Sequence, residues 1–165
     1  MAPSEPALRE CAAQVGYRLG ARRLLLTTAE SCTGGWIAKL VTDQAGSSAW
    51  FERGFVVYSN AAKVELLGVR ETTLMECGAV SAETVGEMAQ GALAHSRADL
   101  ALAVSGVAGP GGGSAAKPVG TVWLAWMLKD NVVRVRHYRF DGDRDAVRAQ
   151  AVYAALQGVL DVLAD

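Results

Sequence analysis

The sequence is poor in the residues that build metal sites and disulfide frameworks. Its 165 residues include three cysteines and only two histidines. Cys11, Cys32 and Cys77 are odd in number, lie far apart and form no CxxC pair. We therefore expect neither a zinc site nor a set of structural disulfides. With so few cysteines to pair, the reducing cytoplasm is the simplest location for the protein.

A charge bias and a long apolar run are also missing. Sixteen Lys and Arg residues face seventeen Asp and Glu residues, which gives a formal net charge of −1. The longest basic run is Arg22-Arg23, so the basic stripe typical of nucleic-acid-binding modules is not seen. No apolar segment approaches the length that spans a bilayer, and the N-terminal "MAPSEPALRE" does not read as a secretory signal. The sequence thus predicts neither a nucleic acid nor a membrane as partner.

What the chain does have is enough apolar material for a core. Hydrophobic residues make up 51% of it, and its length is ordinary for one domain, which we expect to cover 1–165. Apolar residues at three- and four-residue spacing predict helices, and short apolar or alternating runs predict strands. The expected helices cover 5–21, 36–43, 60–68, 81–96 and 143–163, and the expected strands cover 23–29, 51–59, 99–106, 120–128 and 132–140.

The order of these elements indicates the fold class. Strands and helices alternate before the last two strands, as in α/β proteins whose sheet is covered on both faces. The runs at 120–128 and 132–140 alternate around "KDN" and predict an antiparallel hairpin. We therefore expect a three-layer α/β/α sandwich with a mixed sheet that includes this C-terminal hairpin. Candidate helix ends are Gly20 and Gly68, and candidate N-caps are Asn60 and Ser81.

Polar residues gather where three of the expected strands end. The first cluster is "ESCTGG" at 30–35. The second has Tyr58 and Asn60 at the end of a strand and Lys63 on the next helix turn, and the third is Ser105 with the glycine-rich loop that follows it. Because ligand-binding loops collect at strand ends in such sheets, we expect one composite pocket. Its expected binding residues are Glu30, Thr33, Gly34, Gly35, Asn60, Ser105, Gly106, Ala108, Gly109 and Gly112.

Ser31 is either a nucleophile or a helix cap. A serine between a strand and a glycine-opened helix is placed as in a nucleophile elbow, although the pattern G-x-S-x-G is absent. In that role, the N–H groups at the N-terminus of the next helix would stabilise an oxyanion. The same position suits a hydroxyl that only caps the helix. Cys32 is a rival nucleophile, but no histidine is expected near it.

Lys63 is the candidate base for such a serine. His95 falls in an expected helix and His137 in an expected strand, so a Ser-His-Asp triad has little support. Lys63 begins the apolar stretch "KVELL", where burial would lower its pKa and make the neutral amine available. Tyr58 would relay or donate a proton beside it. The alternative is that Lys63 is an ordinary surface lysine.

The glycine-rich loop and two arginines are candidates for holding a polar ligand. The loop 106–113 is not a P-loop, because no GKS or GKT ends it, but its backbone can approach a phosphate or a carboxamide closely. The alternative is a flexible surface loop. Arg144 and Arg148 are spaced i, i+4, so they can face the same way and bind a phosphate. They can equally lie in solvent or pair with neighbouring aspartates.

Several segments together resemble a known family. They are "TAESCTGG" at 28–35, "YSNAAK" at 58–63, "SGVAGPGGG" at 105–113, "KPVGTVW" at 117–123 and "GDRDAVR" at 142–148. In this order they resemble the C-terminal domain of the competence/damage-inducible protein CinA, a family that includes stand-alone bacterial nicotinamide-nucleotide amidases. The resemblance runs from the first expected helix to the last.

The resemblance implies hydrolysis of the carboxamide of nicotinamide mononucleotide to nicotinic acid mononucleotide and ammonia, in pyridine-nucleotide recycling, without a metal or organic cofactor. It implies Ser31 as the nucleophile, Lys63 as the base and Tyr58 as an assisting group, with Arg144 as a phosphate ligand. Position 111 is glycine where many relatives carry a polar residue, so no side-chain role is implied there. The sequence holds no counterpart of the large N-terminal domain of full-length CinA proteins, so nothing supports that domain's pyrophosphatase activity.

Two other functions stay open at this point. One is a non-catalytic nucleotide- or partner-binding domain of the same fold, which would keep the pocket but place Lys63 far from Ser31. The other is an amidase for a different small amide. We also expect a homodimer, for which Trp36, Trp50 and Trp126 are candidate subunit contacts.

Overall fold

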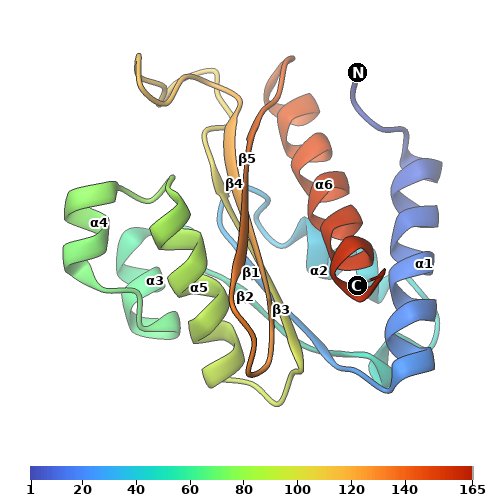
Figure 1. The fold of residues 1–165 in the computed structure, drawn as a ribbon. Helices are drawn as coiled ribbons and strands as arrows, with labels where there is room; N and C mark the ends of the chain where they lie inside the picture. Colours follow the sequence, from blue (N-terminus) through green and yellow to red (C-terminus); the bar gives the residue numbers. More distant parts are fainter. Residues whose placement is uncertain (165) are drawn as a thin grey trace.

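The computed structural model describes residues 1–164, which form a five-stranded sheet with helices on both faces (Figure 1). The elements follow in the order α1 (Glu5–Arg22), β1 (Leu26–Glu30), α2 (Trp36–Thr42), the 3₁₀ turn η1 (Ser47–Ala49), β2 (Phe51–Val56), α3 (Asn60–Leu67), α4 (Glu71–Cys77), α5 (Ala82–Ala94), β3 (Leu100–Gly106), β4 (Thr121–Leu128), β5 (Arg134–Arg139) and α6 (Arg144–Ala164).

The sheet is mixed, with the strand order β2-β1-β3-β4-β5. β1 runs parallel to both of its neighbours, so that Glu30 lies opposite Val56 of β2 and Val104 of β3. β4 is antiparallel to β3, and β5 is antiparallel to β4. The expected mixed sheet with a C-terminal antiparallel hairpin is therefore confirmed.

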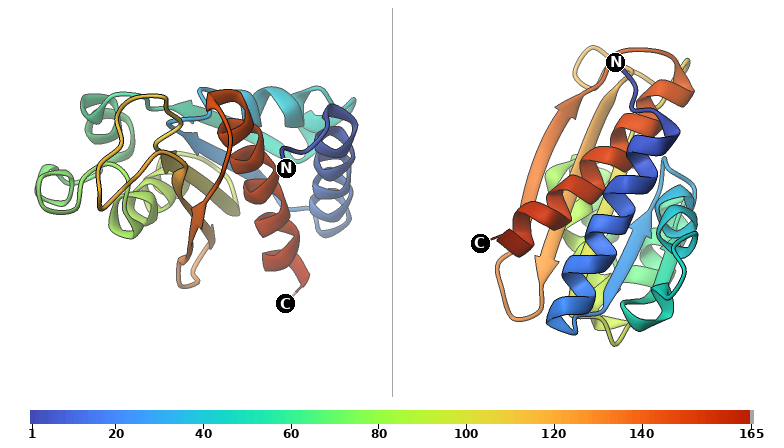
Figure 2. Two further views of the ribbon diagram at one scale, coloured as in Figure 1. Left: turned by 90° about the horizontal axis from the view of Figure 1, so that it is seen from above. Right: turned by 90° about the vertical axis from the view of Figure 1, so that its right-hand side faces the viewer.

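Helices cover both faces of this sheet. α1, α2 and α6 lie on one side of it, and α3, α4 and α5 lie on the other (Figure 1). Figure 2 shows α1 and α6 side by side across their face. β3 contributes to both apolar layers, because alternate residues such as Leu102 and Ala103 point to opposite faces. No helix among the described residues is long and apolar enough to cross a bilayer.

The ends of two helices differ from the prediction. α1 continues past Gly20 to Arg22 and is capped by Arg23, whose backbone is left-handed (φ 54°) and whose N–H bonds the carbonyl of Gly20. α3 is capped by Ser59 rather than by Asn60. The Ser59 hydroxyl accepts a hydrogen bond from the N–H of Ala62 at 3.0 Å, which makes Asn60 the first helical residue.

The chain between α3 and α5 contains a helix that the sequence did not predict. α4 has seven residues and no side-chain cap at Arg70, so the usual start signals are missing. On either side of it, the predicted helix end at Gly68 and the predicted N-cap at Ser81 are confirmed.

Two of the tryptophans proposed as subunit contacts belong to the core of the chain instead. Trp126 is 1% exposed, and its indole N–H donates to the carbonyl of Ala155 at 2.8 Å. Trp50 is also buried and lies against Gly16 of α1. The expectation that these two rings lie at a subunit contact is therefore wrong, because the chain's own helices cover them.

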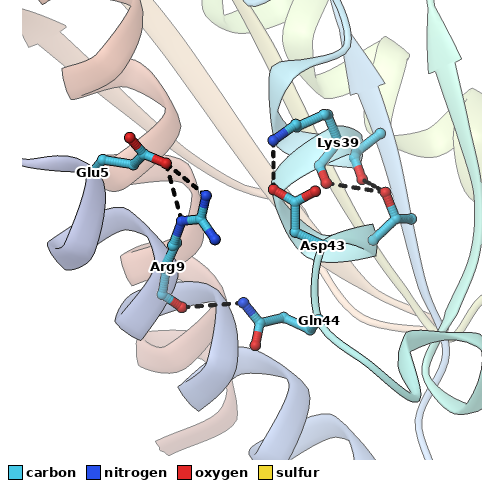
Figure 3. A network of polar contacts seen from close by, with 7 residues as sticks. Glu5, Arg9, Lys39, Asp43 and Gln44 are labelled. Atoms are coloured by element: carbon cyan, nitrogen blue, oxygen red, sulfur yellow. Dashed lines mark hydrogen bonds and ion pairs between the residues drawn. The ribbon is translucent and has the colours of Figure 1, made fainter.

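Charged residues of α1 and α2 line a groove of about 650 Å³ on the α1–α2–α6 face. Figure 3 shows the ion pair of Arg9 with Glu5 on α1 and that of Lys39 with Asp43 at the C-terminal end of α2, each 2.6 Å long. Gln44 joins the two helices, because its side-chain N–H group reaches the carbonyl of Arg9 at 3.4 Å. Each ion pair lies within one helix and near solvent, so it contributes little to stability.

The close approach of α3 to α5 generates a prediction about stability. A Cβ at Gly91 of α5 would overlap the backbone carbonyl of Leu67 at the end of α3, and a backbone atom cannot move aside. Gly91→Ala should therefore lower the free energy of unfolding by about 1–3 kcal/mol. The control is Gly20→Ala in α1, where an added Cβ would meet no neighbouring atom within 4 Å. This substitution should raise the free energy of unfolding by about 0.5–1 kcal/mol. Urea unfolding measures both, and equal stability of the two variants would contradict this account of the packing.

Candidate active site

The predicted polar clusters meet at the carboxyl ends of β1, β2 and β3. The chain leaves β1 toward α2 on one face and leaves β2 toward α3 on the other, and a crevice opens where neighbouring connections diverge in this way. The crevice is a cleft of about 200 Å³. It is lined by Ser31, Cys32, Tyr58, Asn60, Lys63, Ala79, Val80, Ser105, Gly106, Ala108 and Arg144.

Ser31 and Lys63 are in direct contact inside this cleft. The Nζ atom of Lys63 lies 3.0 Å from Ser31 Oγ, 2.9 Å from the carbonyl oxygen of Val57 and 3.2 Å from that of Tyr58. The two carbonyls can only accept hydrogen bonds. A neutral amine would give one N–H to each of them and direct its lone pair at the Ser31 hydroxyl. The contacts of Lys63 therefore match those of a base poised to take the serine proton.

The surroundings of Lys63 favour this neutral form. The residue is 1% exposed although it carries an amine, and burial lowers its pKa from the ordinary value of 10.5. The neighbouring Cys32 has a smaller effect in the opposite direction. Within residues 1–164, no carboxylate forms an ion pair with Lys63 to hold its proton.

The side chain of Glu30 stabilises the turn that follows Ser31 through hydrogen bonds. Glu30 is fully buried on the opposite side of β1. Its Oε1 accepts from the Thr33 hydroxyl (2.7 Å) and from the N–H of Ile37 (2.8 Å), and its Oε2 accepts from the N–H of Ala38 (3.0 Å). These N–H groups belong to the first turn of α2. The expectation that they stabilise an oxyanion at Ser31 is corrected, since the Glu30 carboxylate already takes them.

Arg148 holds the same turn from the side of α6. Its Nε donates to the carbonyl of Cys32 and its Nη2 to the carbonyl of Thr33, both at 3.1 Å. Its guanidinium also lies 5.4 Å from the ring centroid of Trp36. Arg148 therefore lines the groove beside α1 and α2 rather than the cleft, although the sequence suggested a role with Arg144 in phosphate binding.

Arg144 and Tyr58 lie at the mouth of the cleft. Arg144 Nη1 donates to the carbonyl of Gly109 in the glycine-rich loop at 2.7 Å, and its Nη2 lies 3.4 Å from the Tyr58 hydroxyl. Tyr58 meets Lys63 only through its backbone carbonyl, because no bond joins its hydroxyl to the amine or to Ser31 within the described chain. The relay from the Tyr58 hydroxyl to Lys63 that the sequence suggested is thus not formed in this structure.

The remaining predicted residues divide between the cleft and its surroundings. Those that line the cleft are Asn60, Ser105, Gly106 and Ala108. Thr33, Gly34 and Gly35 form the turn between β1 and α2 and line the groove on the other side of it. The two glycines have φ values of 61° and 96°, which suit glycine. Gly112 lies in the glycine-rich loop, outside the cleft lining.

Sequence reasoning missed the apolar wall of the cleft, which is formed by Ala79 and Val80. They follow α4, the helix without start signals, and carry no motif of their own. Lys117, which follows the glycine-rich loop in the sequence, contacts this region, because its amine donates to the carbonyl of Cys77 at the end of α4. The wall is therefore a product of the tertiary fold.

Two other chemistries have little support in the cleft. Burial raises the pKa of the Cys32 thiol to about 12, so this rival of Ser31 stays protonated near neutral pH. Among the described residues, no group of three or more His, Cys, Asp and Glu is placed to hold a metal ion.

Comparisons with known proteins agree in sequence and in fold. A family model of the CinA C-terminal domain matches residues 8–163. The nicotinamide-nucleotide amidohydrolase PncC of Escherichia coli (strain K12) is 59% identical over 150 residues, which are 91% of each chain. The protein of the same name from Pseudomonas putida is 56% identical over 151 residues, 92% of this chain and 94% of the other. The crystal structure of the competence/damage inducible protein CihA from Agrobacterium tumefaciens is 45% identical, with a TM-score of 0.93 over 100% of this chain and 99% of that one.

The buried amine of Lys63 predicts a specific dependence of stability on pH. Its pKa is lower in the folded chain than the ordinary 10.5, so between these values the unfolded chain binds the extra proton. Raising the pH through this window therefore increases the free energy of unfolding, and the increase ends near 10.5. Denaturant unfolding at several pH values should show this rise in the wild type relative to Lys63→Met. Lys39→Met, which removes a lysine whose side chain is 66% exposed, is the control. Parallel curves for the wild type and Lys63→Met would refute a depressed pKa.

The hydrogen bonds of Glu30 to Thr33, Ile37 and Ala38 act as a clamp on the turn and predict that Glu30 controls the reactivity of Ser31. In Glu30→Gln, one carboxylate oxygen becomes an amide nitrogen, so one of the three buried donors loses its acceptor. The cost should be about 1–3 kcal/mol of stability. A displaced turn should also slow the labelling of Ser31 by a fluorophosphonate probe, by up to about a hundredfold. Glu10→Gln, at an exposed position on α1, should label at the wild-type rate. Wild-type labelling of Glu30→Gln would show that the clamp does not position the serine.

Proposed function

The chain belongs to the family of the CinA C-terminal domain, and we propose that it is an amidase that hydrolyses the carboxamide of nicotinamide mononucleotide. The products would be nicotinic acid mononucleotide and ammonia. The observation that carries the proposal is the 3.0 Å contact between Ser31 Oγ and the buried amine of Lys63. The names of relatives at 56–59% identity agree with it.

This contact favours an enzyme over a non-catalytic binding domain. A domain that only bound a nucleotide would have no use for a lysine that is removed from solvent and has no acidic partner, because such burial is costly for an amine. A lysine in solvent and far from Ser31 would have supported the binding domain. The structure has the opposite arrangement, with Lys63 at the bottom of the cleft.

In the first half of the proposed reaction, Ser31 Oγ attacks the carboxamide carbon while its proton passes to the lone pair of Lys63 Nζ. The resulting tetrahedral intermediate carries its negative charge on the former carbonyl oxygen. The backbone N–H of Cys32 directly follows the nucleophile and is the candidate donor to this oxygen, as in nucleophile elbows. Collapse of the intermediate breaks the C–N bond, and the Lys63 ammonium gives its proton to the leaving nitrogen, so ammonia departs.

In the second half, water hydrolyses the ester formed on Ser31. Neutral Lys63 takes a proton from the water as it attacks the ester carbon, and it returns that proton to Ser31 Oγ as the ester bond breaks. The acid product is released, the Ser31 hydroxyl is restored, and water is the reactant consumed in this half. In this scheme Lys63 makes every proton transfer, which agrees with its contact to Ser31 and with the position of the Tyr58 hydroxyl beside Arg144.

Arg144 supports the choice of a phosphorylated substrate. It supplies the guanidinium of the cleft lining and lies at the mouth, where one of its N–H groups already bonds Gly109 and the rest of the fork faces Tyr58. A carboxamide held at Ser31 would leave the ribose phosphate of the nucleotide pointing toward this mouth. Guanidinium groups bind phosphate strongly through paired N–H donors.

Ammonia release from nicotinamide mononucleotide tests the proposal directly. The wild type should release ammonia at a rate that rises with pH as Lys63 loses its proton, with a midpoint below 10.5. Ser31→Ala should lower the rate about a thousandfold or more. Ser48→Ala, which removes an exposed hydroxyl outside the cleft, is the control and should match the wild type. Two results would count against the proposal: no ammonia from folded protein between mildly acidic and alkaline pH, or full activity in Ser31→Ala.

A further inference from the structure

Tyr58 occupies an unusual position for a residue that the mechanism above does not use. Its side chain is 63% exposed and belongs to neither apolar core, yet it lines the cleft. Its position is fixed at both ends, because its backbone carbonyl accepts from Lys63 and its hydroxyl lies 3.4 Å from Arg144. The ring therefore spans the mouth of the cleft without packing against the chain's own core.

The walls of the cleft carry no negative side chain. The lining consists of serines, small apolar residues, Tyr58, the thiol of Cys32, the amide of Asn60, the buried amine of Lys63 and the guanidinium of Arg144. No carboxylate of the described residues lines it, since the nearby Glu30 faces the other side of β1 and bonds the turn. A positively charged ligand group would therefore find no counter-ion inside.

The substrate in the proposed function does carry such a group. The ring of nicotinamide mononucleotide is an N-alkylated pyridinium with a fixed positive charge, and its phosphate is negative. The electron-rich face of an aromatic ring attracts a cation that lies over it. The carbonyls of Val57 and Tyr58 are already bonded to Lys63, and Tyr58 supplies the aromatic ring of the cleft lining.

On the basis of the proposed function, we infer that Tyr58 determines specificity for the charged pyridinium ring, while the adjacent Arg144 takes the phosphate. Together the two side chains recognise a zwitterionic ligand. The ring face receives the cation, and the guanidinium at 3.4 Å from its hydroxyl receives the anion. The role of Tyr58 rests on its ring rather than on its hydroxyl.

The test compares two ligands that differ only in the charge and aromaticity of the ring. Nicotinamide mononucleotide has the pyridinium, and its reduced form has a neutral dihydropyridine with the same carboxamide, ribose and phosphate. Calorimetry on Ser31→Ala protein measures both dissociation constants without turnover. The charged form should bind about three- to tenfold more tightly than the reduced form, as expected for a cation over a ring.

Second substitutions in the Ser31→Ala background isolate the ring. Tyr58→Leu should bring the ratio of the two dissociation constants close to one, whereas Tyr58→Phe should keep the ratio, because it keeps the aromatic face. Tyr17→Leu, at a tyrosine on α1 that is 76% exposed, should also leave the ratio unchanged.

The outcomes separate this inference from the proposed function. Binding of both ligands with the same ratio in Tyr58→Leu and Tyr58→Phe would overturn the role of Tyr58, while ammonia release by the wild type would leave the amidase intact. A ratio of the two dissociation constants close to one in Tyr58→Phe would also overturn the inference, since the preference would then depend on the hydroxyl. A wild type that releases no ammonia, together with a Ser31→Ala protein that binds neither ligand, would overturn both.

Discussion

The amine of Lys63 is enclosed by two backbone carbonyls and one hydroxyl, and the chemistry of the cleft depends on the fact that all three are uncharged. A buried lysine is usually paired with a carboxylate. Such a partner would stabilise the ammonium, and an ammonium has no lone pair with which to accept the proton of Ser31. Burial among neutral acceptors instead favours the free amine. The fold supplies this environment by bringing the first turns of α3 against the ends of β1 and β2, and the Ser59 cap fixes where α3 begins.

The alternation of side chains along β1 and into the following turn separates Ser31 from the charged groups that bind its backbone. Ser31 and Glu30 are neighbours in sequence, but they face opposite sides of the sheet. The Glu30 carboxylate accepts hydrogen bonds from the hydroxyl and N–H donors of the turn, and Arg148 donates hydrogen bonds to two of the turn's carbonyls. Both charges therefore act on the backbone that carries Ser31 without entering the cleft. A carboxylate on the cleft side would instead pair with Lys63 and hold its proton.

The sequence predicts the meeting of Ser31 and Lys63 because parallel strands bring their carboxyl ends to one edge of a sheet. The strands were recognisable from their apolar runs, so the polar residues that follow them could be grouped. The hydrogen-bond partners of Arg144 and Arg148 could not be predicted in this way. Helical spacing places Arg144 and Arg148 on neighbouring surface, but the carbonyls that bind them belong to Gly109 and Cys32. α4 and the apolar wall after it escaped prediction because a short helix without a cap gives no local signal.

The charges of substrate and site reinforce one another in the proposed reaction. A pyridinium bound under Tyr58 would bring a fixed positive charge close to Lys63, and a like charge lowers the pKa of an amine. The bound substrate would thereby add to the effect of burial and favour the form of Lys63 that takes the serine proton. The phosphate would act in the opposite direction, but Arg144 at the mouth would compensate its charge. In the proposed reaction, a cleft whose described lining holds no carboxylate and has Arg144 at its rim would therefore suit a zwitterion whose positive end lies inside. The same lack of a carboxylate would favour both the base and the specificity.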